Sequence, residues 1–163
     1  MISPTYRAGH GMGDLSSRSL AQNLALGSGQ YARAMMLPMA PPVAGDLALA
    51  YHLILEALRK GCGNEDHMAS MMQLTIKTML VGESSGLKLR PQVFRDAQEG
   101  IVRCRRIRSN TGSCDLDLPT YKSLCEVVAT FERQLVGAQF YEFMLADEKL
   151  KALIARGNKK SGK

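Results

Sequence analysis

The chain has no Trp, only 5 Tyr and 4 Phe, and no long apolar run. A membrane-spanning helix needs about 20 consecutive apolar residues, so we predict none. The first residues are polar and rich in glycine, and they lack the apolar stretch of a signal peptide. We therefore expect a cytoplasmic protein with reduced thiols.

The sequence also lacks the usual patterns of metal sites and active sites. The cysteines form no Cys-x-x-Cys pair, and no Walker loop, Gly-x-Ser-x-Gly, His-Glu-x-x-His or dinucleotide fingerprint occurs. His52 and Glu56 are spaced as i and i+4, but a carboxylate metal site within helices needs several such elements. We therefore expect no catalytic residue, no cofactor and no metal ligand. We expect Cys104 and Cys125 to be apolar core residues.

Helix-forming residues dominate the chain from Asp46 onward, and 10 Met are present. Apolar residues at helical spacing predict helices over residues 46–60, 65–82, 91–108, 119–137 and 138–155. Asp46 and Asn64 are expected N-caps, and Gly82 is an expected helix end. The fold class is predicted to be all-α, an antiparallel bundle of four to five helices over residues 45–155. A flexible segment rich in Gly, Pro and Met precedes it over residues 1–44, and a basic tail follows over residues 156–163.

The first predicted helix is apolar on two sides. One stripe faces the core, and Leu49 and Leu53 fall on the opposite side. Such a helix lies either inside a bundle or at a dimer contact. The candidate interface residues are Leu49, His52, Leu53 and Glu56.

The net charge of +6 is unevenly distributed. Residues 45–155 hold 14 basic and 14 acidic residues, so the excess lies in the two ends. The stretch "RCRRIRSNTGSCD" (103–115) still gathers four arginines. We expect Arg105 and Arg108 to follow the core edge and meet acids of another helix, and Arg103 to pair with Glu99. The candidate phosphate contacts are Arg103, Arg106, Lys159 and Lys160.

The stretch "LILEALRKGCGNEDHMASMM" has the order helix, glycine turn, helix. A recognition helix needs hydrogen-bond donors at its start, and this one begins with Glu65 and Asp66, which phosphate repels. The pattern therefore favours a helical hairpin over a DNA-reading helix-turn-helix.

Four segments resemble a group of small, uncharacterised helical proteins of beta-proteobacteria, some of them automatically labelled Fis-like transcription regulators. The segments are "LALAYHLILEALRKGCG", "RCRRIRSNTG" after Ala97, "LDLPTYKSL" and "ERQLVGAQFYEFMLA". The resemblance implies an all-helical cytoplasmic protein and assigns no functional residue. Fis-like proteins end in a helix-turn-helix, whereas this chain ends in one amphipathic helix and a lysine-rich tail.

Taken together, the patterns predict a non-enzymatic regulatory or accessory protein that acts through protein-protein contacts and self-associates. The alternative is a nucleic-acid-associated regulator that uses the basic tails and the cluster from Arg103 to Arg108. A protein partner is not identified by the sequence, and no membrane association is expected.

Overall fold

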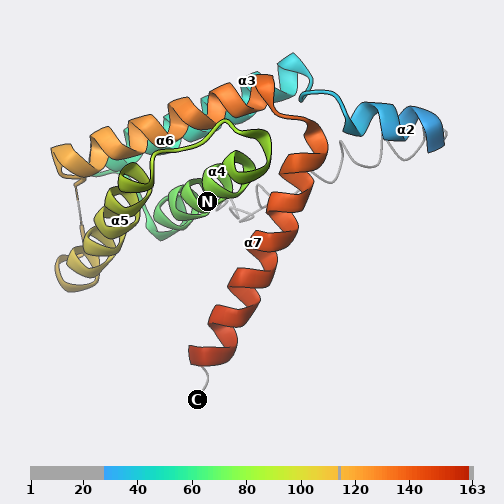
Figure 1. The fold of residues 1–163 in the computed structure, drawn as a ribbon. Coiled ribbons are helices and arrows are strands. Elements are labelled where there is room, and N and C mark those ends of the chain that lie inside the picture. The colour runs from blue at the N-terminus through green and yellow to red at the C-terminus, as the bar shows by residue number, and fades with distance from the viewer. Residues whose placement is uncertain (1–27, 114, 162–163) are drawn as a thin grey trace, which may run out of the picture. The chain divides into compact units, whose positions relative to one another are not determined.

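The computed structural model describes residues 28–113 and 115–161, and the side chains of residues 28 and 158–161 lie outside that description. All of its regular elements are α-helices, which confirms the predicted all-α class. The described residues form six helices (Figure 1): α2 (Ser28–Met35), α3 (Pro41–Arg59), α4 (Glu65–Ser85), α5 (Pro91–Thr111), α6 (Leu118–Gly137) and α7 (Phe140–Ser161). The predicted number of four to five is too low, because α2 forms within a stretch that was predicted to be flexible.

The contacts divide the chain into two units, Met1–Met35 and Met36–Lys163. Of the first unit, the structure describes only α2, a short helix with Arg33 in its last turn. The second unit holds α3 to α7.

Helix α3 begins at Pro41, five residues before the predicted start at Asp46. The prediction assigned residues 41–44 to the flexible segment rich in Gly, Pro and Met and made Asp46 the N-cap, which is wrong because Asp46 lies inside the helix. Proline is tolerated in a first helical turn, because its missing N–H would have no partner there. The backbone N–H of Ala44 donates to the carbonyl of Ala40 at 3.0 Å and closes this turn. Ala44 is buried, so the added turn contributes to the core.

Both ends of α4 are defined by local chemistry. Asn64 is the predicted N-cap, and its side chain accepts from the backbone of His67 at 2.8 Å. The His67 ring accepts from the backbone of Asn64 and completes a capping box. The predicted end at Gly82 is wrong, since the helix continues to Ser85 and stops at Gly86, which has a φ of 77°. Gly82 instead lets the following loop pass close by, because a Cβ there would lie 3.0 Å from Lys88 Cα.

Helix α4 is central in the second unit, where it contacts α3, α5, α6 and α7. Helix α6 also packs against α3 and α5, whereas α4 is the only described helix whose backbone packs closely against α7. Residues Ile54, Leu58, Met68, Met71, Leu74, Ile101, Leu124, Val128, Phe131 and Leu135 are among the core residues. Phe131 makes edge-to-face contacts with Tyr51 of α3 and Phe143 of α7, with ring centroids 5.4 and 6.0 Å apart.

The α5–α6 contact depends on one glycine. A Cβ on Gly100 would lie 2.2 Å from Thr120 Oγ1 and 2.8 Å from Thr120 Cβ, so a side chain at this position has no room. Further along α6, the buried Gln134 amide donates to the carbonyls of Thr78 and Leu87 at 2.8 Å each. These donations fix α6 against α4 and against the loop that follows α4.

Candidate functional site

The candidate site is the outer face of α3. Leu49 and Leu53 are 58% and 62% exposed, while Ile54 and Leu58 on the inner side are buried at 6% and 2% exposure. Within the described part of the chain, the helix is therefore covered on one side only. The sequence left two explanations for the apolar outer face, burial inside the bundle or a dimer contact. The exposure of these leucines excludes burial inside the described part of the domain.

The other two candidate interface residues are engaged within the second unit. His52 Nε2 lies 2.8 Å from Glu132 Oε1 of α6. The Glu56 carboxylate accepts from the Arg59 guanidinium at 2.8 to 3.0 Å and from the Tyr121 hydroxyl at 3.1 Å. These contacts pair α3 antiparallel with α6 and form a polar border beside the exposed leucines.

The groups at the Glu56 end of this border shift one another's pKa values. The hydrogen bond from Arg59 holds the Glu56 pKa below its ordinary value, and the nearby Lys60 charge adds to the effect. Hydrogen bonding with Cys125 and Glu56 raises the Tyr121 pKa to about 12. The Arg59 guanidinium lies 5.8 Å from the centre of the Tyr121 ring, within the range of a cation–π contact. At neutral pH the cluster therefore holds one ion pair and a neutral phenol.

Sequence reasoning did not assign Glu132 and Tyr121 to this surface. Each lies far along the chain from its partner on α3, and the pairing follows from the register of two packed helices. Apolar residues at helical spacing predicted both helices, but no local signal predicted which residue of α6 would face His52.

Three of the four clustered arginines are bound within the domain. Arg103 donates to Asp117 and to Thr120 Oγ1, at 3.2 Å each, so its predicted pairing with Glu99 is replaced by a contact with the start of α6. Arg105 forms an ion pair with Glu65 of α4, as predicted. Arg108 meets the backbone carbonyl of Gly63 at 2.6 Å rather than an acid.

Asp117 explains why Arg103 turns toward α6. Its carboxylate caps α6 by accepting from the backbone of Thr120 at 2.7 Å. Hydrogen bonds from Thr120, together with Arg103, lower its pKa. Both acids are exposed, but the capping hydrogen bond holds the Asp117 carboxylate in place beside Arg103, whereas Glu99 forms no hydrogen bond with another described residue.

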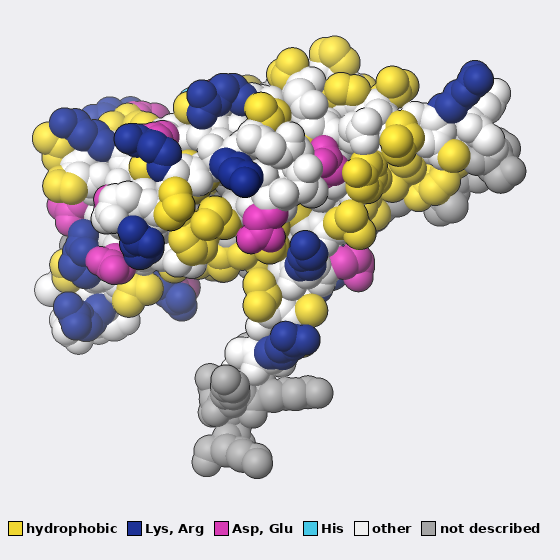
Figure 2. All heavy atoms as spheres, in the orientation of Figure 1, with side chains coloured by type: hydrophobic (Ala, Val, Ile, Leu, Met, Phe, Trp, Pro, Cys, Tyr) yellow, Lys and Arg dark blue, Asp and Glu magenta, His cyan; other side chains and the backbone are white. Residues whose placement is uncertain are grey.

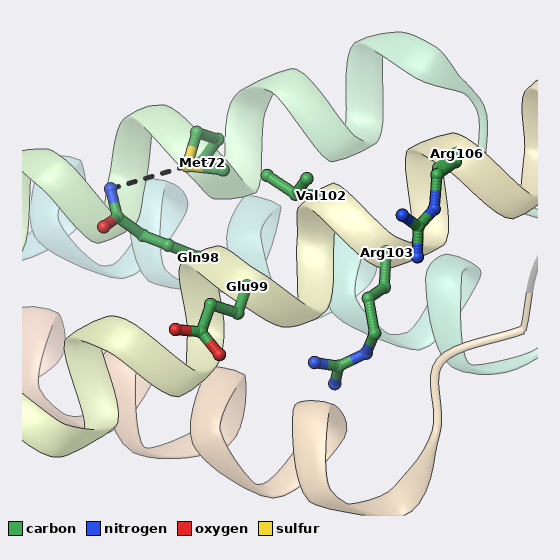
Figure 3. Close-up of a pocket in the computed structure, with 6 residues that line it drawn as sticks. All are labelled: Met72, Gln98, Glu99, Val102, Arg103 and Arg106. Atoms are coloured by element: carbon green, nitrogen blue, oxygen red, sulfur yellow. Dashed lines mark hydrogen bonds between the residues drawn. The ribbon is translucent and has the colours of Figure 1, made fainter.

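Arg106 differs from its neighbours, because it is exposed and has no hydrogen-bond or ion-pair partner among the described residues. With Arg103 it lines a pocket of about 470 Å³ between α4 and α5 (Figure 3). Met72 reaches this pocket from α4, and the other labelled residues come from α5. On the face shown in Figure 2, basic and acidic side chains are interspersed rather than gathered by sign. That face is therefore mixed in charge and carries no continuous basic patch.

The remaining candidate phosphate contacts, Lys159 and Lys160, fall on α7. The helix runs to Ser161, beyond its predicted end near residue 155, and residues 151–157 are all exposed. The side chains of both lysines lie outside the described residues.

No three His, Cys, Asp or Glu side chains of the described residues come together as metal ligands would. No described helix combines the length and apolar character needed to cross a bilayer. Cys104 is buried and Cys125 packs against the core, as predicted, whereas Cys62 is exposed and Cys114 lies outside the described residues.

Comparison of the chain with models of protein families, with curated proteins and with solved structures finds no match. The resemblance to Fis-like helical proteins therefore stays a prediction.

Proposed function

We propose that this is a non-enzymatic regulatory or accessory protein of the cytoplasm, which acts through protein-protein contacts and self-associates through α3. The observation that carries the proposal is the exposure of Leu49 and Leu53, each more than half accessible and one helical turn apart. Single exposed apolar residues are common on protein surfaces, but neighbouring large ones are typical of a contact site.

The surroundings of the leucines support a protein contact. A typical interface has an apolar centre and a polar rim. Here His52 with Glu132, and Glu56 with Arg59 and Tyr121, form an ordered polar border next to the leucines. Because these side chains are already held by hydrogen bonds, less conformational entropy is lost on binding.

The proposal is tested by sedimentation velocity of the full chain over a wide concentration range. Leu53→Asp should raise the dissociation constant of the self-associated form at least about tenfold, because a carboxylate would be buried in the contact. Val102→Asp is the matched control, since Val102 is similarly exposed, at 57%, but lies on α5. A chain that stays monomeric at millimolar concentration would contradict the proposal.

The alternative, a nucleic-acid-associated regulator, is favoured by one observation, the exposed and unpartnered Arg106 beside the pocket. It is tested by fluorescence anisotropy with a labelled DNA duplex at increasing salt. Binding through the predicted contacts should fall steeply with salt, and it should weaken in Arg106→Ala and after deletion of residues 156–163. Binding that is unchanged in both variants would contradict the alternative, and so would the absence of binding at low salt.

A further inference from the structure

One line of residues runs along the outer face of α3 and onto its C-cap. Its members are spaced alternately by three and four positions: Asp46, Leu49, Leu53, Glu56 and Lys60. This spacing keeps side chains on one side of a helix and is the pattern of helices that pair along their length. The line thus ends in an acid, Asp46, and in a base, Lys60, with the two leucines and Glu56 between them.

The two end charges have no hydrogen-bonding partner in the same molecule, although the Lys60 charge lies close enough to Glu56 to help lower its pKa. Asp46 and Lys60 are both exposed, and neither side chain forms a hydrogen bond or an ion pair with another described residue. Glu56, the remaining charge on the line, is already bound by Arg59 and Tyr121. A partner for this face should therefore present a base opposite Asp46 and an acid opposite Lys60.

The positions of these charges are symmetric about Leu53. Each lies seven residues from it, two helical turns or about 10.5 Å along the axis. A twofold axis at Leu53 would place Asp46 of one copy against Lys60 of the second copy, and the reverse pair on the other side. It would also bring Leu49 of one copy to Ala57 of the other, where a small side chain leaves room for a large one.

We propose that the partner of this face is a second copy of the same chain, docked antiparallel along α3 with the twofold axis at Leu53. The inference rests on the proposed function and adds the orientation and register of the contact. A parallel arrangement would put Asp46 against Asp46 and Lys60 against Lys60, and both pairs repel. Two helical faces of this length form a small interface, so the dimer is of the weak, transient class.

The test measures the dissociation constant of the full chain by sedimentation at low ionic strength, where surface charge pairs contribute most. Asp46→Lys alone and Lys60→Asp alone each create two repulsive pairs in the antiparallel dimer, and each should weaken it about tenfold. The double variant, Asp46→Lys with Lys60→Asp, exchanges the two charges and restores both attractive pairs. Its dissociation constant should lie within about threefold of that of the parent. Arg95→Asp, the control, makes the same charge change as Lys60→Asp at an exposed position of α5 and should have little effect on the dissociation constant.

The outcomes separate the two proposals. If Leu53→Asp breaks the dimer while both single charge reversals leave it unchanged, the antiparallel register is wrong and the proposed function stands. The antiparallel register is also wrong if the double variant dimerises more weakly than either single variant. If the parent chain does not dimerise at any concentration, both proposals fail. Circular dichroism of each variant confirms that the helices are retained.

Discussion

Gly100→Ala should destabilise the protein, although alanine favours a helix over glycine by about 0.5 to 1 kcal/mol. The new Cβ would lie 2.2 Å from Thr120 Oγ1, 2.3 Å from Thr120 Cγ2 and 2.8 Å from Thr120 Cβ. Rotating the threonine moves Oγ1 and Cγ2 but leaves Cβ in place, so α5 and α6 have to separate. Overpacking of this kind costs about 1 to 3 kcal/mol, and we expect a net loss of about 1 to 2 kcal/mol after the helical gain.

The change is measured by urea unfolding followed by circular dichroism, with Gly45→Ala as the matched control. Gly45 is an exposed helical glycine of α3 with nothing within 4 Å of its added Cβ. Its replacement should stabilise the protein by about 0.5 to 1 kcal/mol, so the same substitution has opposite signs at the two positions. Gly100→Ala and Thr120→Ala together should destabilise the protein by at least about 0.5 kcal/mol less than the sum of the two single losses, because the second change removes Oγ1 and Cγ2 from the contact. A Gly100→Ala protein as stable as the Gly45→Ala protein would refute the close-approach argument.

Three further predictions concern polar contacts. Gln134→Glu removes amide donors from two carbonyls and should lower the free energy of unfolding by about 2 kcal/mol or more at neutral pH, measured by urea unfolding; an unchanged midpoint would contradict the donor role. Asp117→Ala should cost about 0.5 to 2 kcal/mol as a lost N-cap. Because the Asp117 pKa is lowered in the folded state, its charge stabilises the protein above the ordinary carboxyl pKa, near 4, and this part is lost as the pH falls through the lowered value. Asp117→Asn keeps a capping oxygen but removes the charge. The difference in the free energy of unfolding between the parent and Asp117→Asn should therefore become smaller in acid. A difference that does not depend on pH would contradict this reasoning. Cys125→Ala should lower the Tyr121 pKa from about 12 toward its ordinary value, seen in alkaline absorbance titration against Tyr121→Phe; an unmoved titration would exclude Cys125 as its cause.

Local chemistry in the sequence predicted the parts of the fold that neighbouring residues determine. Asn64 caps α4 because its side chain reaches a backbone N–H only three residues away. Gly82 shows the limit of that reasoning, since its role depends on a loop packed against it and not on helix termination. A glycine in sequence does not distinguish the two causes.

For the candidate site too, the sequence predicted the exposed residues of one helix but not their contacts with other helices. The two-sided pattern of α3 placed Leu49 and Leu53 opposite the core, and the structure leaves them exposed. The contact of His52 with Glu132 was not predicted, because it depends on how far α6 slides along α3. For the same reason the predicted partner of Arg103 was Glu99, one turn away on the same helix. In the structure its guanidinium instead forms an ion pair with Asp117, at the start of α6.

The arrangement of α7 has a consequence for how the molecule opens. Among the described helices its close backbone packing is with α4, to which it adds the Lys77–Asp147 ion pair, and it touches α6 through the Phe131–Phe143 contact. Detaching α7 breaks only its own packing against α4 among the described helix pairs. Detaching α4 breaks its packing against four helices, α3, α5, α6 and α7. Amide hydrogens of α7 should therefore exchange through a partial opening of lower free energy than the global transition, and those of α4 only through global unfolding. Such an opening would uncover one side of the central helix while α3, with its outward leucines, stays folded.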